Sequence, residues 1–173
     1  SAYQKSMRGS DPDAALHYLA RLLEAGDMIS AIRRLLICAS EDVGLAYPQL
    51  IPIVKSCVDI ALQVGLPEAR IPLGTIVCEM ALSPKSNTAH IALDIALEDI
   101  EKGNVGSIPN HIRPDSPDYK YPHDYKGAYV QQQYLPDKLK NKKYYVPKDI
   151  GYEKTIKEIY DRLEKLKNGQ NKK

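Results

Sequence analysis

Residues 10–26 read SDPDAALHYLARLLEAG, a stretch that carries the signals of an α-helix from start to end. At its start, Ser10 or Asp11 can cap the free backbone amides, and Pro12 suits the first turn because no N–H is needed there. Gly26 can end the helix in a left-handed turn. Between these ends, apolar side chains recur at helical spacing, namely Leu16, Leu19, Ala20 and Leu23. The stretch therefore predicts one amphipathic helix with a buried stripe.

Helix signals of the same kind recur as far as residue 103. The expected helices run from about Met28 to Gly44, from Pro48 to Gly65, from Pro72 to Leu82, and from Ser86 or Asn87 to Gly103. Their connections are only a few residues long, so helices that follow one another should be antiparallel neighbours. The third and fourth helices are apolar on most of their circumference and should lie at the centre. No stretch alternates as a strand does, so the sequence predicts an all-α helical bundle over residues 1–103.

Residues 104–151 are built differently and show little periodicity. Residues 121–136 alone hold four tyrosines, two prolines and three glutamines. An irregular segment of this length needs side chains that dock on a surface, and tyrosine suits that task because it is large, rigid and able to satisfy its hydroxyl. We therefore expect docking, on the bundle or on a second subunit, by Tyr121, Tyr125, Tyr129 and Tyr134.

Two further helices are predicted in the last third of the chain. A short one is possible around Gln131–Leu139. A longer one should occupy residues 152–173, where apolar side chains return at helical spacing on one face. The end of this C-terminal helix should fray from Asn168 onward.

The charge is distributed unevenly along the chain. Residues 1–112 hold nine Lys and Arg against thirteen Asp and Glu, whereas residues 113–148 hold eight against four. An acidic front and a basic back can pair within one chain, join subunits head to tail, or meet a polyanion. Four lysines and two tyrosines lie within residues 138–145, a composition typical of single-stranded nucleic-acid surfaces. The alternative, a solvated loop with its tyrosines packed on the bundle, is slightly favoured.

Nothing in the sequence indicates catalysis. There is no GxxxxGK[ST] phosphate loop and no GxGxxG motif, so no familiar nucleotide site is present. His90 and Asp94 are four residues apart and could form half of a metal site, but an ordinary helix-surface pair is favoured because no second pair of ligands is visible. The adjacent carboxylates at 41–42 and 98–99 are expected to be solvated or to pair with the basic tail. We predict no catalytic residue, no metal ligand and no cofactor in this chain.

The connection Ser83–Asn87, which reads SPKSN, admits two interpretations. In the first, Pro84 ends one helix and Ser86 or Asn87 caps the next. In the second, Lys85 lies beside the free amides of a helix N-terminus and forms an anion site. The structural interpretation is favoured.

The remaining composition points to a soluble intracellular protein. Cys38, Cys57 and Cys78 lie far apart on apolar helical faces, which fits reduced thiols better than disulfides or zinc. No apolar run approaches a membrane span and no secretory signal is visible. Because the chain starts at Ser1 without a Met, we expect a piece of a longer protein.

Four separated blocks of the sequence resemble one family. They read SAYQKSMRGSDPDAAL at residues 1–16, ASEDVGLA at 39–46, ALSPKSN at 81–87, and YPH at 121–123 continuing to QQYLP at 132–136. In this order they resemble the segment that follows the ATPase core in the RarA/MgsA family of AAA+ ATPases, which includes the eukaryotic Werner-helicase-interacting protein. The resemblance covers nearly the whole chain.

The resemblance implies a helical domain like the collar of clamp loaders, which holds the subunits of a DNA-replication and recombination ATPase together as a tetramer. Residues 1–9 would be the trailing edge of the ATPase lid. ATP and Mg would bind in the motor, outside this chain, and the parent would be a bacterial, cytoplasmic, nucleoid-associated protein that meets DNA and other replication proteins. A non-catalytic oligomerisation module is the leading hypothesis. The alternative is direct DNA binding, for which the residues to test are Arg8, Lys85, Lys126, Lys138, Lys140, Lys142 and Lys143.

Overall fold

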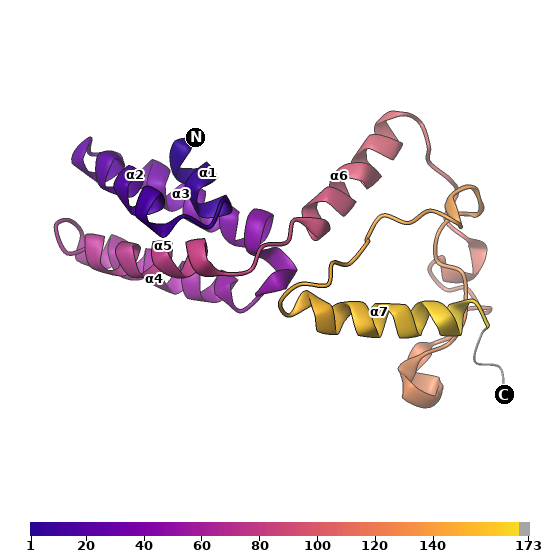
Figure 1. Cartoon of the computed structure of the whole chain (residues 1–173). Coiled ribbons are helices and arrows are strands. Elements are labelled where there is room, and N and C mark those ends of the chain that lie inside the picture. Colours follow the sequence, from indigo (N-terminus) through magenta and orange to yellow (C-terminus); the bar gives the residue numbers. More distant parts are fainter. Residues whose placement is uncertain (170–173) are drawn as a thin grey trace. The chain divides into compact units, whose positions relative to one another are not determined.

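The computed structural model describes residues 1–169 and is all-helical, with no strand in that range. The prediction of an all-α fold is confirmed. Seven α-helices follow one another along the described chain: α1 (Ala2–Arg8), α2 (Pro12–Glu24), α3 (Met28–Cys38), α4 (Leu50–Val64), α5 (Arg70–Leu82), α6 (Thr88–Glu101) and α7 (Glu153–Lys167) (Figure 1). Contacts divide the chain into a first unit, residues 1–90 with 147–157, and a second unit, residues 91–146 with the segment from Glu158 onward.

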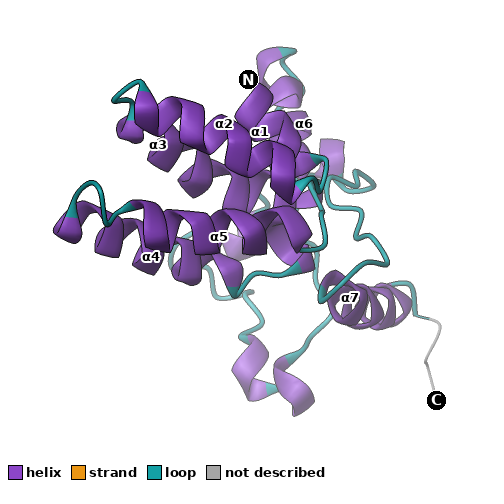
Figure 2. Cartoon of the chain, turned by 60° about the vertical axis from the view of Figure 1, so that its left-hand side comes forward, coloured by secondary structure: helices purple, strands orange, loops and turns teal. Residues whose placement is uncertain are grey.

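The first unit consists of two helical layers around one apolar core. Helices α1, α2 and α3 form one layer, and α4 and α5 pack side by side as the other (Figure 2). The largest buried side chains come from both layers: Met7, Leu35, Leu50, Leu73, Ile76 and Met80. Tyr3 of α1 is also buried, and burial raises the pKa of its hydroxyl, which donates to the carbonyl of Ala31 over 3.4 Å. Residues at the start of the chain therefore complete this core.

The helix starts follow the capping chemistry of the sequence. The carboxylate of Asp11 accepts from the amide of Ala14, and that of Asp27 accepts from Ser30, which caps α2 and α3. After α3 the backbone widens into a π-helical turn, Ala39–Val43, followed by a 3₁₀ turn, Gly44–Ala46. The predicted second helix, to Gly44, is thus an α-helix only as far as Cys38.

Helix α4 is buried along one stripe only. Leu50, Val54, Val58 and Ala61 face the core, whereas large apolar side chains on both flanks remain 40–50% exposed. The prediction that this helix lies at the centre is therefore wrong for its outer circumference. Helix α4 thus carries more apolar side chains than the core of the first unit buries.

The second unit holds the irregular segment. Between α6 and α7 the chain forms only four 3₁₀ turns, at Asn110–Ile112, Pro122–Asp124, Lys126–Ala128 and Asp137–Leu139. The short helix suggested around Gln131–Leu139 is reduced to the last of these turns. Pro136 disfavours helical geometry at the residue before it. The side-chain amides of the three glutamines instead donate to the carbonyls of Lys167, Lys120 and Leu135.

Helix α7 begins one residue after the expected Tyr152 and ends at Lys167. The predicted fraying beyond Asn168 concerns mostly residues 170–173, which lie outside the described residues. Within residues 1–169, every helix is too short or too polar to span a lipid bilayer.

Candidate interaction surfaces

A buried carboxylate joins the two chain segments of the first unit, residues 1–90 and residues 147–157. Glu153, at the start of α7, is 0% exposed, and its two carboxylate oxygens accept hydrogen bonds from the hydroxyls of Ser86 and Thr88. Both hydroxyls lie at the N-terminal end of α6. At this helix start, where the sequence suggested an anion site beside Lys85, two hydroxyls thus bind a carboxylate of the same chain, which docks residues 147–157 on the helices.

Two glycines allow the backbones to approach at this junction. A Cβ on Gly151 would lie 2.3 Å from the carbonyl oxygen of Ala46, and one on Gly44 would lie 2.7 Å from that of Ser86. Both glycines have positive φ, which L-residues rarely adopt. The amides of Tyr152 and Ser86 donate to the carbonyls of Ala46 and Asp42, over 2.8 and 2.7 Å. The sequence blocks ASEDVGLA and ALSPKSN thus meet residues 151–153 in one tightly bonded junction.

Lys85 acts at the end of α5 in this structure. Its ammonium donates to the carbonyls of Ala81 and Ser83 and to the Ser10 hydroxyl, at 2.9, 2.6 and 3.1 Å. Burial lowers the pKa of this half-buried group. The carbonyls at a helix C-terminus are natural partners for a lysine, so the side chain has little freedom to reach a phosphate.

Arg8 balances a small acidic cluster. Its Nε lies 2.6 Å from Oδ1 of Asp42, a buried carboxylate, and a terminal nitrogen lies 4.0 Å from Glu41. Cys38 completes a group whose potential ligand atoms lie within 4.8 Å of one another. Burial raises the pKa of the Cys38 thiol to about 12, so it is not a reactive thiolate. With the guanidinium against both carboxylates, the group is an internal ion pair rather than an attractive cation site.

The predicted cations of the second unit fall into two groups. Lys142 pairs with Asp99 at 3.1 Å and Lys143 pairs with Glu164, so both are tied to neighbouring helices. The Tyr144 hydroxyl and Lys142 hold the pKa of Asp99 below its usual range. The sequence predicts that the carboxylates at 98–99 are either solvated or paired with the basic tail, and Asp99 is paired with Lys142 of that tail. The side chains of Lys126, Lys138 and Lys140 are exposed and pair with no described carboxylate.

The four predicted docking tyrosines do not share one environment. Tyr129 and Tyr134 line a hollow of about 660 Å³ in the second unit, together with Lys140 and residues of α7. The Tyr134 hydroxyl accepts from the Gln132 side chain at 2.9 Å. Tyr121 packs against the His123 ring at 5.2 Å, and Tyr125 is 43% exposed. Only Tyr129 and Tyr134 are thus brought together in a concave site.

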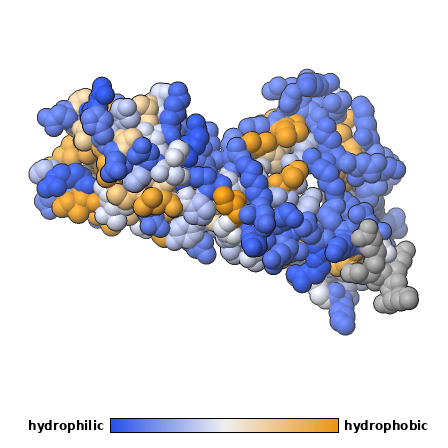
Figure 3. All heavy atoms as spheres, viewed as in Figure 1, coloured by the Kyte–Doolittle hydropathy of each residue, from blue (hydrophilic) through white to orange (hydrophobic). Residues whose placement is uncertain are grey.

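The outer surface of α4 carries an apolar seam, which we define as Ile53, Cys57, Ile60 and Val64. The spacing of four, three and four residues places these side chains on one face. Ile53, Ile60 and Val64 are 40%, 49% and 48% exposed. Apolar surface is visible where α4 and α5 lie in Figure 3. Contiguous apolar surface of this kind marks interaction sites in soluble proteins.

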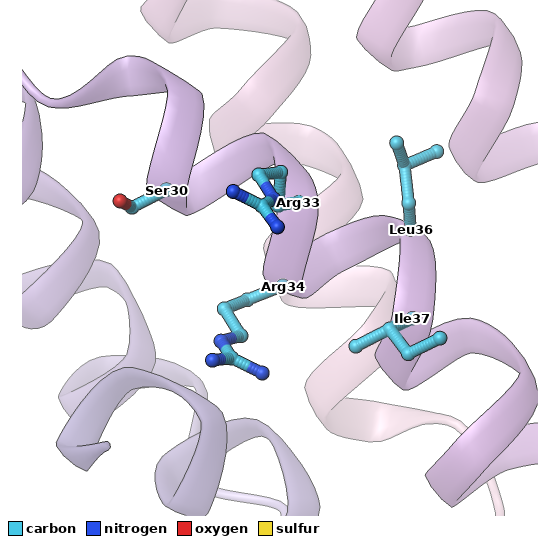
Figure 4. Close-up of a pocket in the computed structure, with 5 residues that line it drawn as sticks. All are labelled: Ser30, Arg33, Arg34, Leu36 and Ile37. Atoms are coloured by element: carbon cyan, nitrogen blue, oxygen red, sulfur yellow. The ribbon is translucent and has the colours of Figure 1, made fainter.

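A second surface, not identified from the sequence, lies on α3. We call it the α3 face: Ile29, Ser30, Arg33, Arg34, Leu36 and Ile37, all exposed. The last five line a hollow of about 450 Å³, shown in Figure 4 with both guanidinium groups projecting from the helix. Neither arginine pairs with a described carboxylate. The signal available in the sequence was an Arg-Arg pair opposite the buried stripe of a helix.

Comparison with known proteins identifies the family. The family model described as "MgsA AAA+ ATPase C terminal" matches residues 9–164. Replication-associated recombination protein A of Bacillus subtilis is 54% identical over 96% of this chain, and its Haemophilus influenzae counterpart is 36% identical over 94%. The chain spans 42% and 39% of the lengths of these relatives. The resemblance seen in the four sequence blocks is confirmed, and the chain belongs to the C-terminal domain family of the MgsA, or RarA, AAA+ ATPases.

Proposed function

We propose that this chain is the non-catalytic self-association domain of a RarA/MgsA-type AAA+ ATPase and holds its subunits together as a tetramer. The observation that carries this proposal is the apolar seam of α4. The first unit leaves the seam exposed, and burying it against a second copy would remove several large apolar side chains from water. Each fully buried Ile is worth about 1.5–3 kcal/mol, which is enough to drive association.

The wider role follows from the relatives' names. Proteins called replication-associated recombination protein A are similar to this chain. We therefore place the parent protein in DNA replication and recombination, in the bacterial cytoplasm at the nucleoid, with DNA and other replication proteins as its partners. ATP and Mg would act in its motor. The division into a bundle at 1–103, an irregular segment at 104–151 and a helix at 152–173 belongs to the same proposal.

Charged side chains in the seam should prevent assembly. The double variant Ile53→Glu/Ile60→Glu is expected to weaken self-association about a hundredfold, because it removes roughly 3 kcal/mol of apolar burial and inserts unpaired charge. Light scattering and sedimentation of the 173-residue chain measure this effect. Assembly of the unaltered chain should persist at high salt, since apolar contacts are not screened.

The matched control for the seam places two glutamates at exposed positions of a different helix, α2. The variant His17→Glu/Ala20→Glu changes two exposed residues of that helix and should leave the mass unchanged. If the unaltered chain stays monomeric at low and at high salt concentration, the proposed self-association is contradicted. Loss of assembly in the control as well would place the interface elsewhere.

A second candidate function is single-stranded nucleic-acid binding in the second unit. The hollow that holds Tyr129 and Tyr134 also holds Lys140 and Lys167, so rings for stacking and cations for phosphates share one site. Lys138 lies two residues before Lys140, in the 3₁₀ turn Asp137–Leu139, and is exposed. This candidate does not compete with assembly, because several subunits would multiply weak phosphate contacts.

Lys138 and Lys140 are the residues that test nucleic-acid binding. Reversing both to Glu should weaken binding of a single-stranded oligonucleotide and reduce the slope of log affinity against log salt by about 1.4, at roughly 0.7 per phosphate contact. Lys142 and Lys143 are unsuitable for this test, because a Glu at either position would be repelled by the carboxylate of Asp99 or Glu164 and could disturb the fold. Lys5→Glu/Lys154→Glu, in the first unit, is the control. Unchanged affinity and slope, measured by fluorescence anisotropy, would exclude this site.

A further inference from the structure

The α3 face combines two arginines with exposed apolar side chains. Arg33 and Ile37 point away from the core stripe of α3, with Ile29 and Leu36 beside them. Ile29 is 59% exposed and Ile37 is 50% exposed. Arginine is enriched in protein interfaces, and the buried centre of an interface is more apolar than the rest of the surface. A face that bound only phosphates would not need this apolar surface.

Helix α6 presents a surface of complementary chemistry. We define the α6 face as Leu93, Leu97 and Ile100, which are 61%, 50% and 59% exposed, together with the exposed carboxylates Asp94, Glu98 and Glu101. Within the described part of the second unit, no other helix packs along α6. Glu98 pairs with Lys102 on the helix surface, an exposed contact of small energetic value. The helix thus carries an acidic, apolar surface that its own unit does not cover.

We propose that the α6 face of one copy docks on the α3 face of a second copy of this chain. The two faces match in kind, since each combines large apolar side chains with charges of one sign, and the signs are opposite. Complementary charges at an interface fix the register of the partners and speed their encounter. The inference rests on the proposed self-association and adds a second contact between copies to that of the α4 seam.

The pairing has a consequence for symmetry. Because the α3 and α6 faces are different surfaces of one chain, each copy offers one of each and the contact is heterologous. Contacts of this kind generate a closed ring if the rotation closes and an open filament if it does not. A closed ring of four is therefore compatible with the proposed tetramer, with the α4 seam forming an additional contact.

Charge reversal of either face should dissociate this contact. The variants Arg33→Glu/Arg34→Glu and Glu98→Lys/Glu101→Lys are each expected to weaken self-association at least about tenfold at 0.1 M salt, because like charges then face each other. The second variant places lysines in the last turn of α6, where they favour the helix dipole, so the fold should be kept. Sedimentation velocity over a concentration series measures the mass, and circular dichroism checks the helix content.

The decisive experiment mixes the two variants. The reversed α3 face of one is complementary to the reversed α6 face of the other, so an equimolar mixture should form complexes that neither variant forms alone. The control, Lys154→Glu/Arg162→Glu, makes the same change in net charge as the α3 variant at exposed sites of α7 and should leave assembly intact.

Each other outcome is decisive. An assembling wild-type chain whose two variants keep its mass would overturn the α3–α6 pairing while leaving self-association in place. If both variants dissociate and their mixture forms no complex, the α3–α6 pairing is overturned as well. A wild-type chain that is monomeric at every concentration would instead remove the proposed function itself.

Discussion

Replacement of Glu153 by Ala is expected to lower the free energy of unfolding of the first unit by about 3 kcal/mol, because two hydrogen-bonded hydroxyls lose their acceptor in a buried site. The carboxylate is 0% exposed and accepts from both Ser86 and Thr88. The hydroxyls lie 3.2 Å apart and can still bond to each other, which limits the cost. Urea denaturation followed by circular dichroism measures the change.

Two further variants separate the role of Glu153 from a general effect on α7. Glu158→Ala removes an exposed carboxylate from the same helix and should change stability by less than about 0.5 kcal/mol. Glu153→Gln keeps an acceptor oxygen but adds donors, so its loss should be intermediate, about 1.5 kcal/mol. Hydrogen exchange should show the earliest loss of protection in the first turn of α7. If Glu153→Ala were as stable as Glu158→Ala, the buried carboxylate would not hold this junction.

Local rules predicted the helices of the first unit well because caps and stripes lie close together in sequence. Asp11 and Pro12 start α2 as expected, and the C-terminal cap of α4 is Gly65, with a φ of 69°. The central position assigned to α4 failed for a physical reason. Apolar composition predicts burial but does not say what covers the surface, and the same composition that suggested a core helix fits one that faces a second chain.

The candidate sites depended on contacts between residues far apart in sequence, which local patterns do not contain. Arg8 and Lys85 are among the candidate DNA contacts, but in the structure Arg8 pairs with Asp42 and Lys85 donates to the carbonyls of Ala81 and Ser83. Glu153 likewise accepts its hydrogen bonds from Ser86 and Thr88, which lie 67 and 65 positions earlier in the sequence. The Arg33–Arg34 pair was visible in the sequence, but its meaning required knowing that no described carboxylate approaches it.

Gly151→Ala is expected to destabilise the first unit by about 3 kcal/mol or more, the sum of left-handed backbone strain and a backbone clash. The added Cβ would lie 2.3 Å from the carbonyl oxygen of Ala46 and 3.0 Å from Cγ of Pro84. That carbonyl cannot retreat freely, because it accepts the amide of Tyr152 over 2.8 Å. The clash would therefore break the docking of residues 147–157 or displace the 3₁₀ turn at Gly44–Ala46.

Gly26→Ala isolates the two contributions to this loss. Gly26 also has a positive φ, 76°, but a Cβ there would meet nothing within 4 Å. Its replacement should cost only the left-handed strain, about 1 kcal/mol. Thermal and urea denaturation of both variants give their free energies of unfolding. We expect Gly26→Ala to be more stable than Gly151→Ala by at least about 2 kcal/mol. Equal losses would mean that Gly151 is needed only for its backbone angle, and the close approach to Ala46 would then contribute nothing to holding α7 on the helices.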